Sequence, residues 1–222
     1  TFCEFELLLV NDGSQDNSLK ICEEFKNKDK RIQIISKSNG GVSSARNEGI
    51  VLSRGRYLTF VDADDYLEPT FLQQLYMSTI NCELDFAYCG YRQFSQDKDK
   101  FLMPKAILSQ NINAALELVK ENITLPLWVC LIKTSIVKDN KILFTTGCKY
   151  GEDQEFIMKV LANSNYINNV KKYLYNYRDN LGSAMAKKTL DHLDFPEAMI
   201  RAENYLKLRN NNLKELNVFS LV

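Results

Sequence analysis

The feature that most constrains the fold is a regular alternation of apolar strand patterns and helical patterns along the first ninety residues. Strands are expected at 6–10, 31–36, 57–61 and 84–91, and helices at 17–27, 42–52 and 69–80. Strands that alternate with helices of about three turns are typical of right-handed βαβ units. The pattern therefore predicts an α/β fold in which helices flank a mostly parallel sheet.

The second half of the chain is less regular. Helices are expected at 111–121, at 152–162 and in the tail after Phe195, and an extended run at 166–177. Residues 95–105 are polar and predict a surface insertion without regular structure. The apolar stretches 127–137 and 141–144 fit no single element. A length of 222 residues allows one sizeable core with an extension.

Composition excludes several classes of protein. The chain is 45% hydrophobic and 25% charged, the balance of a globular protein. Lys+Arg and Asp+Glu both number 28, so the net charge is zero and no global charge favours nucleic acid. None of the six cysteines forms a Cys-x-x-Cys pair, so no zinc site is expected. We expect reduced cysteines and a cytoplasmic setting, with the inner face of the membrane and peripheral membrane association as options.

A single histidine rules out a His-rich metal site and directs attention to carboxylates. The strongest cluster follows the expected strand 57–61 and contains Asp62, Asp64 and Asp65. Carboxylates at a strand end are costly to bury unless a positive group meets them, and ligands of open α/β sheets bind at such ends. The cluster is typical of a Mg²⁺-type ion bound with a phosphate. The alternative is that Asp64 or Asp65 caps the helix expected near Pro69.

Two further turns and the helix expected at 42–52 carry candidate functional side chains. Asp12 follows a strand, where it would cap the next helix or form an Asx-turn, or else accept a hydrogen bond from a ligand. Arg46 would be either a surface residue or a planar donor to a diphosphate or base. Glu152 and Asp153 open a helix, where they either complement its dipole or supply a general base.

The order of these motifs resembles glycosyltransferase family 2 of the GT-A fold. The motifs occupy residues 9–18 (LVNDGSQDNS), 39–47 (NGGVSSARN), 60–65 (FVDADD), 151–156 (GEDQEF) and 175–178 (YNYR). Each motif alone is weak, whereas all of them in this order make the resemblance specific. It covers most of residues 1–185, which are expected to form a transferase domain followed by a helical C-terminal extension over 186–222.

The resemblance implies a nucleotide-sugar donor such as a UDP-sugar. By this resemblance Asp12 meets the nucleobase and Arg46 lies close to the nucleotide. Asp62 contacts the ribose or the metal, and Asp64 binds the Mn²⁺ or Mg²⁺ that bridges the diphosphate.

The resemblance also implies the reaction. Such enzymes invert the anomeric centre in one displacement, with Asp153 as the base and Glu152 beside it. The acceptor would be a hydroxyl of a saccharide or glycolipid, in bacterial surface polysaccharide or glycolipid synthesis.

Two other functions stay open at this point. A sugar-phosphate nucleotidylyltransferase also uses metal-bound carboxylates on an α/β sheet, although it would carry a Gly-rich phosphate loop near its start. Members of the resembling family complete one strand and one helix before the segment that begins at Thr1. The resemblance therefore predicts a truncated domain, which would be either an inactive binding module or a homo-oligomer that restores the sheet.

Overall fold

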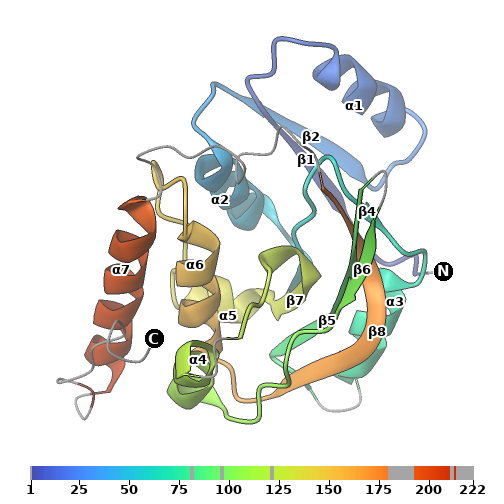
Figure 1. Ribbon diagram of the computed structural model, residues 1–222. Coiled ribbons are helices and arrows are strands. Elements are labelled where there is room, and N and C mark those ends of the chain that lie inside the picture. The colour runs from blue at the N-terminus through green and yellow to red at the C-terminus, as the bar shows by residue number, and fades with distance from the viewer. Residues whose placement is uncertain are drawn as a thin grey trace.

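The computed structural model describes residues 2–80, 83–95, 98–120, 123–179, 193–210 and 213. An N-terminal layer consists of β1 (Leu7–Asp12), α1 (Ser18–Lys26) and β2 (Ile32–Lys37), and α2 (Val42–Leu52) follows it. β1 and β2 pair in parallel, with Leu7 opposite Ile32. Helix α1 lies on the outer side of this pair and α2 on the side that faces the rest of the molecule (Figure 1). The βαβ unit expected from the sequence is therefore confirmed.

A second, six-stranded sheet forms the centre of the molecule. Its strands are β3 (Tyr57–Leu58), β4 (Tyr66–Leu67), β5 (Phe86–Phe94), β6 (Asp99–Leu102), β7 (Cys130–Lys133) and β8 (Ile167–Arg178). The order is β3-β7-β5-β8-β4, and β6 pairs with β5 beside this path. The first five residues of β5 are buried, as expected for a strand that is covered on both faces.

The expectation of a mostly parallel sheet is wrong. Among the described residues, four of the six strand pairings are antiparallel, and β1–β2 and β5–β8 are the parallel ones. Local periodicity identifies a strand but not the direction of its distant neighbours. β7 and β8 both come from the second half of the chain, and they lie on either side of β5 in opposite directions.

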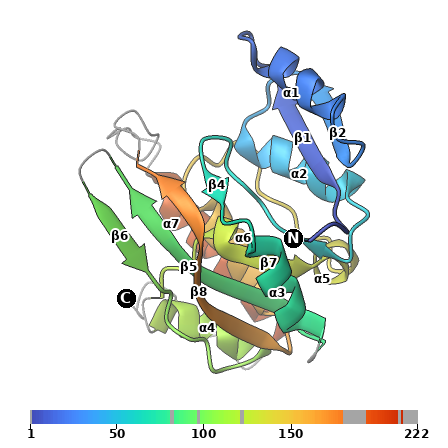
Figure 2. The same cartoon turned by 90° about the vertical axis from the view of Figure 1, so that its right-hand side faces the viewer.

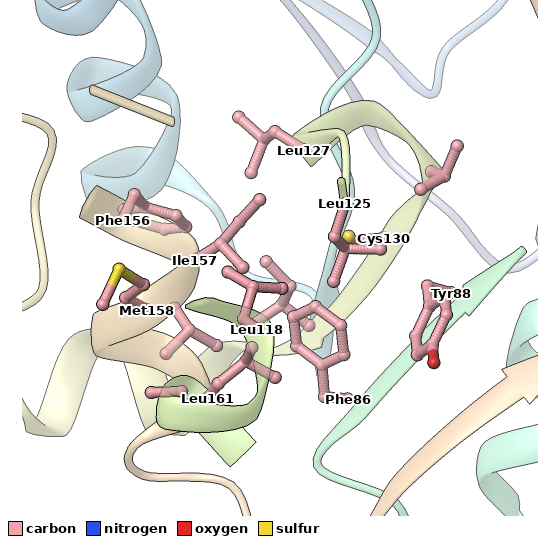
Figure 3. Packing of buried hydrophobic residues seen from close by; sticks show 14 of the residues in the cluster. Phe86, Tyr88, Leu118, Leu125, Leu127, Cys130, Phe156, Ile157, Met158 and Leu161 are labelled. Carbon is pink, nitrogen blue, oxygen red and sulfur yellow. The ribbon is translucent and has the colours of Figure 1, made fainter. Parts of the chain in front are cut away.

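Helices cover both faces of the six-stranded sheet. They are α3 (Phe71–Ile80), α4 (Asn111–Lys120), α5 (Thr134–Asp139), α6 (Glu152–Leu161) and α7 (Asp194–Arg209), with a 3-10 turn η1 (Leu127–Val129). α3 lies against one face, whereas α4 and α6 lie on the other (Figure 2). Figure 3 shows Phe86 of β5, Leu118 of α4 and Ile157 of α6 converging in the core. α7 packs outside α6 through buried Ala198 and Ala202, which confirms the helical tail expected after Phe195.

Two local expectations are corrected. Residues 95–105 are not wholly irregular, because β6 pairs antiparallel with β5. The strand is short, and its two charged residues precede two apolar ones, so it shows no alternating pattern. The strand expected at 57–61 ends at Leu58, so the carboxylate cluster lies in a turn beyond it. The domain boundary expected at 185/186 falls outside the described residues. Within the described ranges, no helix has the length and apolar character needed to cross a bilayer.

Candidate active site

Arg46 connects two acidic turns that are far apart in the sequence. It lies on α2, and its Nη2 atom donates to Asp62 Oδ1 at 3.2 Å while Nη1 donates to Glu152 Oε1 at 3.1 Å. The ring of Phe144 lies 5.4 Å from the guanidinium carbon. Only 15% of the Arg46 side chain is exposed, so water screens these contacts less than on an open surface. Three of the residues predicted from the sequence are therefore in direct contact.

The acidic turn at the start of α6 is shaped by Gly151. This residue has φ +84°, a left-handed conformation that side chains disfavour. Glu152 is buried, and its carboxylate forms an ion pair with Arg46. Asp153 is partly buried, and its Oδ1 accepts the backbone N–H of Gln154 at 2.8 Å. Burial raises the pKa of both carboxyl groups above their ordinary values. A carboxylate with a raised pKa is a stronger proton acceptor once it is ionised.

Helix α7 supports this turn through a buried carboxylate that the sequence did not single out. Glu155 is 1% exposed and accepts from Arg201 Nε at 2.9 Å and from Thr145 Oγ1 at 3.0 Å. Lys159 pairs with the same carboxylate. A Cβ atom on Gly151 would lie 2.9 Å from the ring of Phe195 and collide with α7. α7 therefore packs directly on the turn that carries Asp153.

The turn after β3 is held by β8. The hydroxyl of Tyr175 donates to Asp65 Oδ2 at 2.8 Å and accepts the backbone N–H of Asp62 at 3.2 Å. The N–H of Arg178 donates to Asp65 Oδ1 at 2.8 Å. Asp65 is thus a structural residue of the turn. Asp65 therefore does not fill the alternative role of a helix cap. Tyr175 belongs to the motif at 175–178, but its contact with this turn was not predicted.

Asp62 and Asp64 present a donor set that fits a hard divalent cation. Asp62 directs one oxygen at Arg46 and keeps 35% of its side chain exposed, and Asp64 is exposed. Mg²⁺ and Mn²⁺ prefer oxygen ligands, and Mg²⁺ commonly takes one or two protein carboxylates with water and phosphate. In the described ranges no three His, Cys, Asp or Glu side chains gather around one metal position. The other ligands would therefore come from water and substrate.

Asp12 lies at the end of β1 and anchors the loop that precedes α2. Its carboxylate accepts from Lys37 Nζ at 2.8 Å, from Gly40 N at 3.0 Å and from Gly41 N at 2.7 Å. The hydrogen bond from Lys37 is the main reason that its pKa is lowered. Asp12 does not cap α1, which starts after Asn17. The N–H of Gly40 also reaches Oδ2 at 3.1 Å, so each carboxylate oxygen accepts two hydrogen bonds. The contact of Asp12 with a nucleobase stays a prediction.

The comparisons with known proteins bear on this arrangement. The family model "Glycosyl transferase family 2" matches residues 1–139. This chain belongs to glycosyltransferase family 2. A relative described as an uncharacterized glycosyltransferase, EpsJ of Bacillus subtilis (strain 168), is 30% identical over 99% of this chain and 67% of its own length. A poly(ribitol-phosphate) beta-glucosyltransferase of Bacillus spizizenii is 28% identical over 91% of this chain and 30% of its own length.

Solved structures of the same fold are also found. The crystal structure of S. aureus TarS 1-349 in complex with UDP-GlcNAc superposes with a TM-score of 0.76 at 24% identity, over 98% of this chain and 60% of that one. The GT-A fold predicted from the motifs is therefore confirmed. Family membership also favours glycosyl transfer over the nucleotidylyltransferase alternative. The chain spans about two thirds or less of the length of these relatives.

Proposed function

We propose that this domain transfers a sugar from a UDP-sugar to a hydroxyl acceptor with inversion at the anomeric carbon. The observation that carries the proposal is the contact of Arg46 with both Asp62 and Glu152. An inverting displacement needs a leaving diphosphate on one side of the sugar and a base on the other. One partly buried guanidinium links the turn assigned to the diphosphate with the turn assigned to the base.

The donor would bind on the side of Asp62 and Asp64. A Mg²⁺ or Mn²⁺ ion held by these two carboxylates would supply positive charge where the diphosphate leaves. Arg46 orients Asp62 and adds a fixed positive charge beside it. Asp12 would contact the nucleobase from the end of β1, and its bonds to Gly40 and Gly41 hold the start of α2 in place.

Asp153 would take the proton of the acceptor hydroxyl. Glu152 is the poorer candidate because Arg46 already occupies its carboxylate. Asp153 has a raised pKa, and its hydrogen bond from Gln154 leaves acceptor positions on the carboxylate. Glu152 then acts as a positioning residue, which holds Arg46 between the two turns.

The acceptor class is proposed from the relatives. Matching proteins are described as poly(ribitol-phosphate) glycosyltransferases and as a minor teichoic acid biosynthesis protein of bacteria. We assign this domain to the synthesis of a bacterial surface polysaccharide or related glycopolymer, with a saccharide-bearing acceptor.

Calorimetry with UDP and a panel of UDP-sugars tests the donor half of the proposal. Two carboxylates and a diphosphate repel one another without a cation between them, so we expect binding with Mg²⁺ or Mn²⁺ and little binding in EDTA. Asp64→Ala should remove the metal-dependent part, while Asp139→Ala on the distant α5 serves as the matched control. Equal binding in EDTA would contradict the metal role of Asp62 and Asp64. Binding of the donor without any transfer or hydrolysis of its sugar would contradict the enzymatic role.

A further inference from the structure

A cluster of aromatic rings lies on one face of the central sheet, and we call it the aromatic platform. It consists of Trp128 of η1, Tyr91 of β5 and Tyr175 and Tyr177 of β8. Trp128 stacks on Tyr175 with ring centres 4.3 Å apart and on Tyr177 with ring centres 5.4 Å apart at an interplanar angle of 3°. Tyr91 meets the indole edge-on at 4.7 Å. Residues two apart on a strand share a face, so the indole lies across the face that carries both tyrosines.

The platform is buried at its base and partly open at its surface. Tyr175 is fully buried, whereas Trp128, Tyr91 and Tyr177 each keep part of their surface exposed. Stacking on two rings and an edge-on contact with a third fix the orientation of the indole. A fixed, partly exposed indole costs little conformational entropy when a flat ligand binds.

Hydrogen bonds connect the segments of the platform to both acidic turns of the active site. On one side, the hydroxyl of Tyr175 contacts Asp65 and the N–H of Asp62. On the other side, the side-chain amide of Gln154, next to Asp153, donates to the carbonyl of Leu125 at 3.3 Å, three residues before Trp128. The segment that carries the indole is therefore bonded to the turn that carries the proposed base.

We propose that the aromatic platform binds the acceptor as a pyranose ring, stacked on Trp128 with one hydroxyl directed at Asp153. This inference rests on the proposed function and names its acceptor class. One face of a pyranose is lined with C–H groups and stacks on an aromatic ring, while the hydroxyls at its rim stay free for polar partners. An open-chain polyol phosphate has no such face and would not select an indole.

Trp128 is the single tryptophan of the chain, so intrinsic fluorescence reports on the platform directly. We would titrate the full chain, without nucleotide, with methyl β-glycosides of glucose, galactose and N-acetylglucosamine, and with ribitol 5-phosphate. We expect a saturable change in emission with at least one pyranoside, with half-saturation of about 1 mM as is usual for a weak single-ring ligand. Ribitol 5-phosphate should give none. No saturable change with any pyranoside, or a change with ribitol 5-phosphate alone, would overturn the proposal.

Variants then separate stacking from general packing. Trp128→Phe keeps a flat ring and Trp128→Leu removes it, and Tyr166→Leu changes an exposed aromatic residue before β8 as the matched control. By saturation-transfer NMR, the pyranoside signal should persist in the Phe variant and in the control and be lost in the Leu variant. An unchanged signal in Trp128→Leu would overturn the proposal. If that variant does not fold, the wild-type titration still decides.

Steady-state kinetics distinguishes this inference from the proposed function. In the Leu variant, KM for the acceptor should rise about tenfold or more, and by a larger factor than KM for the donor, whereas the Phe variant should keep KM for the acceptor close to the wild-type value. A rise in KM for the donor alone would overturn the inference and leave the transferase function standing. Absence of donor binding in the wild type would contradict the transferase function, and the fluorescence titration would still decide the inference.

Discussion

The N-terminal layer and the six-stranded sheet with α6 are built in different ways. Helix α1 has no buried residue, and Ile21 and Phe25 on it are more than half exposed. Helix α6 has seven buried residues among its ten, and Phe156 is fully buried against Phe144 at a ring distance of 4.1 Å. Apolar burial therefore stabilises the second region and contributes little in the first.

Polar contacts hold the N-terminal layer in place. Asp12 ties β1 to Lys37 and to the loop before α2, and Glu6 accepts the backbone N–H groups of Arg54 and Gly55. Regions with few buried apolar contacts open locally at lower free energy than the core. Asp12 and Arg46, on the proposed donor side, therefore lie on or beside the N-terminal layer, which has few buried apolar contacts. The proposed base, Asp153, lies on α6, which is well packed. The following experiments test this division.

Asp153→Asn should have the largest effect, on turnover rather than on stability. Loss of a general base typically costs about 10²–10⁴-fold in rate. The raised pKa means that ionised Asp153 destabilises the fold as pH rises through that pKa, so the neutral Asn should leave the unfolding free energy unchanged or slightly higher. Transfer assays and denaturant unfolding would measure both. If Glu152→Gln were inactive and Asp153→Asn kept its activity, Glu152 would be the base and Asp153 the positioning residue.

The pH dependence of kcat provides a separate check on the base. Asp153 must be ionised to accept a proton, and burial raises its pKa above the ordinary value of 3.8. The rate should therefore fall on the acid side through a pKa that lies above 3.8. A rate that stays flat down to pH 4 would argue against Asp153 as the base.

Phe156→Ala and Phe25→Ala compare the two regions directly. Removing a buried Phe costs about 3–5 kcal/mol of unfolding free energy, because the side chain loses burial and leaves a cavity. The same change at the exposed Phe25 should stay within about 0.5 kcal/mol. Urea unfolding at fixed pH measures both. Equal losses would contradict the division into a loosely packed N-terminal layer and a well-packed second region.

Glu155→Gln tests how α7 supports the acidic turn. It removes the charge that Arg201 and Lys159 contact, at an expected cost of about 1.5–3 kcal/mol. Turnover should fall because the turn that carries Asp153 shifts. The pKa measured from the pH dependence of the rate should not change, since Asp153 itself is still present. Glu203→Gln, which breaks a pair with Lys207 within α7, is the control and should cost about 0.5 kcal/mol. If the two substitutions had equal effects on turnover and on the free energy of unfolding, Glu155 would have no positioning role.

Asp12→Asn should have the smallest global effect and a clear local one. The free energy of unfolding should change by about 1 kcal/mol or less. The amides of Gly40 and Gly41 should exchange faster, because they lose a charged acceptor. The lowered pKa of Asp12 means that its stabilising contribution is present above pH 3.8 and is lost as pH falls through the folded-state value. Protection factors of the two amides in the wild type and in Asp12→Asn at pH 7 check the local effect, and equal protection would contradict it.

The sequence by itself determined the elements whose signals lie within one segment. The helix expected at 42–52 has those bounds in the structure, and the strand–helix–strand order of residues 7–37 is also as expected. The candidate residues Asp62 and Glu152 were identified from their local turns, and Arg46 from the motif at the start of a helix. Periodicity, turn residues and strand ends are properties of neighbouring residues, so a single sequence displays them.

Only the tertiary structure decided how the segments meet. Arg46 and Glu152 are 106 positions apart and Tyr175 and Asp65 are 110, and no local pattern encodes either contact. The antiparallel neighbours of β5 and the support of α6 by Arg201 are of the same kind. Such contacts form because they bury apolar surface and pair charges in the folded chain. Their free energy depends on residues that are far apart in the sequence, so no single segment reveals them.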